Sequence, residues 1–276
     1  MVLLRDLARS WTAGRRIERV AYAFGAVLFL GGIVRLGVLL LDSDPWTGPE
    51  SWRKPAMSGL SSGLTLVSVT WACARIRMDD RGRLAAVGLL TVASVVEVAL
   101  ISAQAWRRVP SPTIGGDAAC TSPTTGGAAI AVSAVVLLVA AFRRGAVDPP
   151  DMRLAVRAGL VLFLVALATT IARGPVADTL EPTHSMALHA VLVLPALSWL
   201  LAFTRWTPLA RLRVVQLALV GHLVPTVVVG VETAVGVDPL DAPAVAGVGA
   251  GFGLFLLGAA VLLACYGVRR FPRRDI

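Results

Sequence analysis

Apolar residues occur along this chain in long runs that short polar segments separate. An α-helix needs about 17 to 25 such residues to cross a bilayer, and only helices satisfy their own backbone at membrane depth over such runs. The pattern predicts an all-α polytopic membrane helix bundle of about eight transmembrane helices. The spans are expected at Val20 to Leu41, Met57 to Arg75, Leu84 to Trp106, Ala128 to Phe142, Leu154 to Arg173, His184 to Phe203, Leu212 to Ala234 and Ala244 to Tyr266.

The charged residues orient these spans. The N-terminal segment is basic, and no small-residue cleavage site closes the first apolar run, which predicts an uncleaved first span. With the N-terminus in the cytoplasm, 20 of the 26 basic residues fall in cytoplasmic segments, and Arg35 lies within a span. The positive-inside rule therefore predicts a multi-pass protein of the bacterial plasma membrane with both termini in the cytoplasm. The chain is expected to be a single membrane domain, 1–276, with short cytoplasmic tails at 1–19 and 267–276.

Composition agrees with a fold that faces lipid. Hydrophobic residues make up 56% of the chain, charged residues 16%, and the mean hydropathy is +0.75. The net charge of +9 does not indicate a nucleic-acid partner, because the arginines sit in short loops and not on a basic face of a soluble module. The expected partners are the lipid bilayer and anionic lipids at its cytoplasmic face. Because Cys73 and Cys265 lie near cytoplasmic helix ends and Cys120 lies in an outer loop, no structural disulfide is expected.

The chain also matches itself after a shift of 128 residues. The shift aligns Trp71 with Trp199, Arg77 with Arg205 and Arg83 with Arg211 without a gap. This pattern predicts two tandem four-helix repeats, at 15–145 and 146–274, related by an axis along the membrane normal because each contains an even number of spans. The alternative is that Trp and Arg at inner helix ends are ordinary interfacial anchors.

Several polar side chains lie within the predicted spans, most of them in the outer half. Such groups are costly in a bilayer, so those that remain usually face the bundle interior. We therefore expect an outward-facing pocket for a ligand or a proton, lined by Glu97, Arg35, His189, His184, Gln104, Glu232 and His222.

Glu97 is the most informative of these residues. A carboxyl group at its depth must be protonated or paired, and Arg35 lies at a similar depth. The two residues form either a structural ion pair or part of a proton or ligand site. His184 and His189 do not share a helix face, so a zinc site built from them alone is not expected.

The segment from His184 to Pro195 resembles a motif of a widespread, uncharacterised family of bacterial multi-pass membrane proteins, in which His-x4-His-Ala-Leu-Gln-x-Leu-Pro opens a late span. Lys54-Pro55, the stretch from Glu97 to Gln104-Ala105 and the stretch from Glu232 to Pro239-Leu240 are similar to other parts of its members. This chain has Ser111-Pro112-Thr113-Ile114 where the family has Ser-His-Phe-Asn, and Leu192 and Glu232 replace glutamines. The resemblance implies the same architecture and names no reaction.

Three functions are compatible with these observations. The first is binding or translocation of a small solute, an ion or a proton through the outer pocket, which we favour because the polar residues converge in depth without forming a known ligand set. The second is a membrane redox or metal protein that binds haem or a metal through His184, His189 or His222. The third is a structural or partner-binding subunit. No catalytic residue is predicted, because the sequence contains none of the motifs Cys-x-x-Cys-His, Walker A, Gly-x-Ser-x-Gly and His-Glu-x-x-His.

Overall fold

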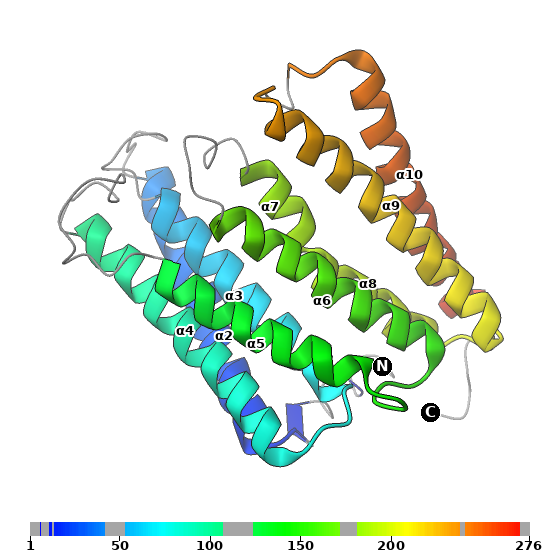
Figure 1. Cartoon of the computed structure of the whole chain (residues 1–276), viewed down its shortest axis with the longest axis horizontal. Coiled ribbons are helices and arrows are strands. Elements are labelled where there is room, and N and C mark those ends of the chain that lie inside the picture. Colours follow the sequence, from blue (N-terminus) through cyan, green and yellow to red (C-terminus); the bar gives the residue numbers. More distant parts are fainter. Residues whose placement is uncertain are drawn as a thin grey trace. The chain divides into compact units, whose positions relative to one another are not determined.

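Long helices make up nearly all of the described chain, as the computed structural model shows (Figure 1). It describes residues 6, 11–12, 14–41, 53–106, 124–171, 181–237 and 241–270, and no strand occurs within these ranges. The all-helical fold class is therefore confirmed. The helices are α2 (Arg16–Leu41), α3 (Arg53–Ala74), α4 (Asp80–Trp106), α5 (Thr124–Phe142), α6 (Pro150–Ile171), α7 (Glu181–Leu188), α8 (Ala190–Leu201), α9 (Pro208–Ala234) and α10 (Ala244–Arg270).

Within the described residues, six helical segments are long and apolar enough to cross a membrane: α2, most of α4, most of α6, α7 together with α8, α9 and α10. These six fit a multi-pass membrane protein. A helix also occupies the place of each remaining predicted span, but α3 carries Arg53, Lys54 and many serines and threonines, and the apolar part of α5 is the short stretch Gly126–Phe142. The count of eight spans therefore stays a prediction.

The chain divides into two compact units. The N-terminal unit comprises Leu4–Ala74 and Asp79–Ser133, and the C-terminal unit comprises Met1–Leu3, Arg75–Met78 and Ala134–Ile276. Each unit has its own set of packed helices.

In the N-terminal unit α2 packs closely along α3, and both helices contact α4. Glycines allow the close approach of α2 and α3. A Cβ atom added to Gly63 would lie 2.5 Å from the backbone nitrogen of Phe29 and 2.6 Å from the carbonyl oxygen of Gly25. Small residues at such an interface let helix backbones meet, which is a common way to pack helices in membranes.

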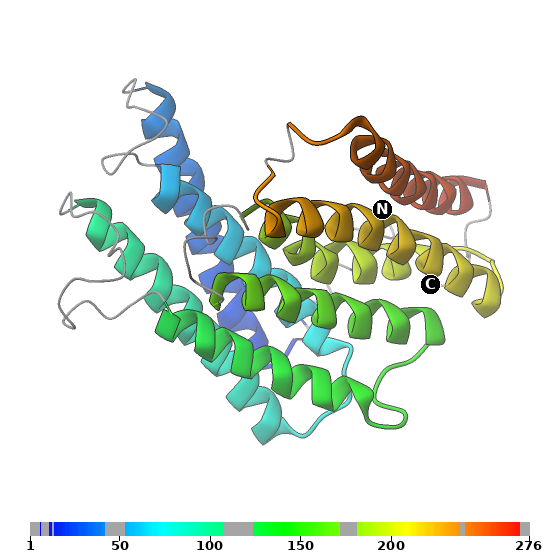
Figure 2. The ribbon, with the colours of Figure 1, turned by 45° about the horizontal axis from the view of Figure 1, so that its top comes forward.

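In the C-terminal unit α6, α7, α8 and α9 contact one another, and α10 packs along α9 (Figure 2). Fully buried apolar side chains, among them Leu194, Leu201 and Val215, form its core. The segment of α7 and α8 is interrupted at His189. Pro195 follows within α8, and a proline removes a backbone donor and disfavours a straight helix.

The helix bounds in the two units follow the spacing of the predicted repeat. Asp80–Trp106 and Pro208–Ala234 begin and end 128 residues apart, and α3 and α7 begin 128 residues apart. The three helices α2, α3 and α4 contact one another in pairs, as do α6, the α7 and α8 segment, and α9.

Candidate functional site

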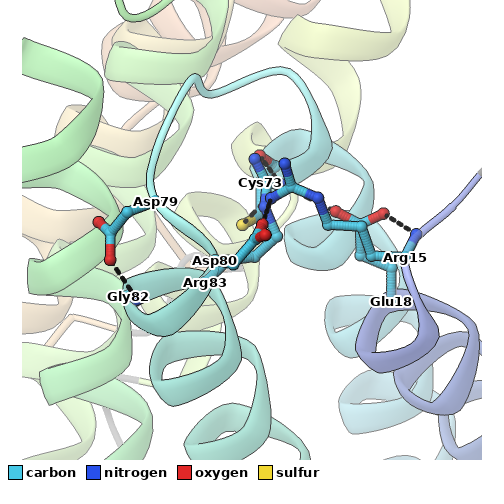
Figure 3. A network of polar contacts seen from close by, with 7 residues as sticks. All are labelled: Arg15, Glu18, Cys73, Asp79, Asp80, Gly82 and Arg83. Carbon is cyan, nitrogen blue, oxygen red and sulfur yellow. Dashed lines mark hydrogen bonds and ion pairs between the residues drawn. The ribbon is translucent and has the colours of Figure 1, made fainter.

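A buried ion pair joins two helix ends of the N-terminal unit, as Figure 3 shows. The Arg83 Nη1 atom lies 2.8 Å from Glu18 Oε1 and also donates to the carbonyl oxygen of Cys73 at 2.9 Å. The exposed fractions of the Arg83 and Glu18 side chains are 5% and 6%. Glu18 accepts a second hydrogen bond, from the backbone N–H of Arg15 at 2.9 Å. Both charges are therefore desolvated and held by the protein.

Local sequence places both partners of this pair. Arg15 precedes α2 and Glu18 is its third residue, so the carboxylate caps the free N–H at the start of the helix. Asp79 caps α4 through a hydrogen bond from the backbone N–H of Gly82 to its Oδ2 atom, at 2.9 Å. This cap sets the first turn of α4, from which Arg83 reaches Glu18.

The C-terminal unit holds an arginine and a carboxylate in the same relation. Arg211 Nη2 lies 3.9 Å from Asp151 Oδ1, and Ser198 Oγ donates to Asp151 Oδ2 at 2.9 Å. Asp151 is fully buried. Thr207 caps α9 by accepting from the backbone N–H of Ala210 at 3.2 Å. As in the other unit, an arginine from the first turn of a capped helix meets a carboxylate from the first turn of an earlier helix.

Sequence reasoning assigned no role to Glu18 or Asp151, and treated Arg83 and Arg211 only as markers of the repeat. The available signal was the cap: Arg83 follows Asp79 by four residues, and Arg211 follows Thr207 by four. An arginine at that position projects from the first helical turn. Its partner lies far away along the chain, so no local pattern reveals it.

A polar stripe follows the buried face of α9 in the C-terminal unit. It consists of His222, Thr226, Glu232 and Thr233, all of which are buried. The Thr233 hydroxyl lies 2.8 Å from the hydroxyl of Thr183 on α7. Polar side chains from two helices therefore meet at the end of this stripe.

His222 and Glu232 differ in how their polar atoms are satisfied. His222 Nε2 donates to the carbonyl oxygen of Met186 at 2.8 Å. Glu232 has an exposed fraction of 8%, and its Oε1 atom has no hydrogen-bond partner among the described residues. A buried carboxyl oxygen without a partner is costly. Glu232 is therefore the predicted pocket residue whose environment is least explained by packing alone.

The other two histidines lie on α7 and at its junction with α8. His184 is half-buried, and its Nδ1 atom donates to the carbonyl oxygen of Ala166 at 2.7 Å. His189 is exposed and bonds through Nδ1 to the carbonyl oxygen of Ser185 in its own helix. The different burial of the two rings agrees with their predicted placement on different faces. Nowhere in the described ranges do three or more His, Cys, Asp or Glu side chains form a group that could hold a metal ion.

The remaining predicted pocket residues belong to the N-terminal unit. Arg35 on α2 and Glu97 on α4 are half-buried, and Glu97 packs beside Gly126 of α5. Gln104 lies in α4, but its side chain is outside the described residues. Because Glu97 and Arg35 belong to one unit and His189 to the other, their common pocket stays a prediction.

No protein-family model matches this chain, and no curated protein and no solved structure is significantly similar to it. The likeness to the uncharacterised membrane family therefore stays a prediction that rests on the motif residues alone.

Proposed function

We propose that the chain is a multi-pass protein of the bacterial plasma membrane that binds or translocates a small solute, an ion or a proton through polar residues near its outer face. In this proposal it has eight spans and two cytoplasmic termini. It also belongs to the uncharacterised family that it resembles, and its basic inner loops contact anionic lipids.

The tandem repeat is part of this proposal. Its support is the shared spacing of α4 and α9, the capping of both helices by the residues aligned at the 128-residue shift, and the use of the aligned Arg83 and Arg211 in buried pairs with a carboxylate. Repeat-built membrane proteins often bind their substrates between the repeats. The repeat thus provides an architecture that suits binding or transport.

The observation that carries the binding function is the state of Glu232. A side chain that serves only to join helices is expected to have its polar atoms paired, as Glu18 does with Arg83. Glu232 is as well buried, yet its Oε1 atom has no partner among the described residues. Ionisable residues kept in membrane helices usually mark pathways for ions, protons or substrates. Glu232 therefore favours a binding role over a purely structural one.

Thermal unfolding of the purified protein in detergent tests this function. A ligand that binds only the folded state raises the unfolding temperature by mass action. The protein is screened against alkali and divalent cations, amino acids and small carboxylic acids at constant pH and ionic strength. We expect a member of the panel to stabilise the wild type and to lose this effect in Glu232→Gln.

The matched control is Asp241→Asn, because Asp241 is an exposed carboxylate just before α10. This variant should keep the full stabilisation. If no member of the panel stabilises the wild type, or if Glu232→Gln is stabilised as strongly as the wild type, binding of a solute or ion at this residue is refuted.

A further inference from the structure

We infer that Glu232 is a proton-binding carboxyl group, so that the ion taken up at the proposed site is H⁺. This inference rests on the proposed function and names its ligand. The juxtaposition that carries it is a buried carboxyl with an unpartnered oxygen at the end of α9, next in sequence to a threonine hydroxyl that contacts α7.

The groups around Glu232 supply no described counter-ion. On α7 the nearest ionisable residue is His184, whose Nδ1 atom is already bonded to Ala166. On α9 itself it is His222, about ten residues or 15 Å further along the helix. Asp241 before α10 is acidic, α8 has no ionisable residue, and none occurs in the half of α6 that ends at Ile171. A buried carboxyl among such neighbours is favoured in its protonated, uncharged form.

A proton suits this site better than a metal ion does. Cations such as Ca²⁺ or Mg²⁺ require six or more oxygen ligands, several of them charged. The described residues provide no group of three or more acidic, histidine or cysteine ligands here. The hydroxyl of Thr233 is also engaged, because it lies 2.8 Å from Thr183 Oγ1 and donates to the carbonyl oxygen of Val229 at 2.8 Å. A proton needs only the carboxyl group itself.

A lipophilic carbodiimide, dicyclohexylcarbodiimide, tests the inference on the whole protein in lipid vesicles. This reagent enters apolar surroundings and reacts with protonated carboxyl groups, and mass spectrometry locates the adduct. We expect Glu232 to be modified, and the rate to fall several-fold as the pH rises and the proton leaves. Addition of Na⁺ or K⁺ at fixed pH should leave the rate unchanged.

The chain offers its own controls. Glu18 and Asp151 are also buried, but each lies beside an arginine, so both should stay unmodified under the same conditions. The adduct should disappear in Glu232→Gln and persist in Glu232→Asp, which retains the carboxyl group. Because the central measurement uses the wild type, a variant that fails to fold does not remove the test.

Absence of the adduct at Glu232, a rate that does not change with pH, or protection by Na⁺ at fixed pH would each overturn the assignment to H⁺. The result is separable from that of the ligand screen. A stabilising solute together with an unreactive Glu232 refutes the proton alone, whereas an inert panel together with pH-dependent modification refutes solute binding alone.

Discussion

Removing one partner of the buried pair between Arg83 and Glu18 should strongly destabilise the N-terminal unit. At 2.8 Å and an effective dielectric constant of about 20, the attraction between the two charges amounts to roughly 6 kcal/mol. Desolvation of both groups offsets much of that gain, so the intact pair contributes little net stability. The cost of breaking it is larger, because an uncompensated charge then stays buried.

The two single variants should differ. In Glu18→Gln the guanidinium group of Arg83 stays charged and keeps only the carbonyl oxygen of Cys73 and an amide oxygen, so we expect a loss of about 3 kcal/mol. In Arg83→Met the carboxyl group keeps the backbone N–H of Arg15 and is able to take up a proton, so the loss should be smaller, about 1.5 to 3 kcal/mol. In the double variant the loss should fall clearly below the sum of the two.

The thiol of Cys73 provides the assay, because it is buried beneath Arg83 in the folded unit. In a background that lacks the other two cysteines, its rate of reaction with a thiol reagent in detergent reports the population of the opened unit. The control is Asp148→Asn, which removes a largely exposed ion-pair partner of Arg77 and should cost less than about 1 kcal/mol. Equal effects of Glu18→Gln and Asp148→Asn, or strict additivity in the double variant, would refute the reasoning.

Three further predictions concern packing, topology and the pocket. Gly63→Ala should destabilise the protein by about 1 to 3 kcal/mol in thermal unfolding, because its Cβ atom would meet backbone of α2, whereas Gly37→Ala, with no neighbour within 4 Å, should be neutral or slightly stabilising. In intact cells an impermeant thiol reagent should reach Cys120, which lies outside the described residues, and should not reach Cys265; labelling of Cys265 would contradict the topology. Glu97→Gln should weaken ligand or proton binding, measured by thermal shift and carbodiimide labelling, while the protein stays folded. Loss of folded protein would instead assign Glu97 a structural role.

The helices themselves were predictable from sequence, because the apolar runs that specify them are a local property of the chain. The runs at Leu84 to Trp106 and Leu212 to Ala234 fall within α4 and α9. The prediction also placed His184 and His189 on different faces, since this requires only the rotation per residue of a helix. Span count was harder, because α3 is a helix whose polar residues leave its apolar character weak.

The polar partners were decided by tertiary structure alone. Glu18 and Arg83 are 65 residues apart, as are no neighbours that helical periodicity relates, and their pairing depends on where α2 and α4 begin in space. Similarly, the sequence identifies Glu232 as a carboxyl group near a helix end, but its burial without a described partner follows from how α9 packs. A sequence determines which side chains must avoid lipid, because that cost belongs to each residue. Which group satisfies them is a property of the packed helices.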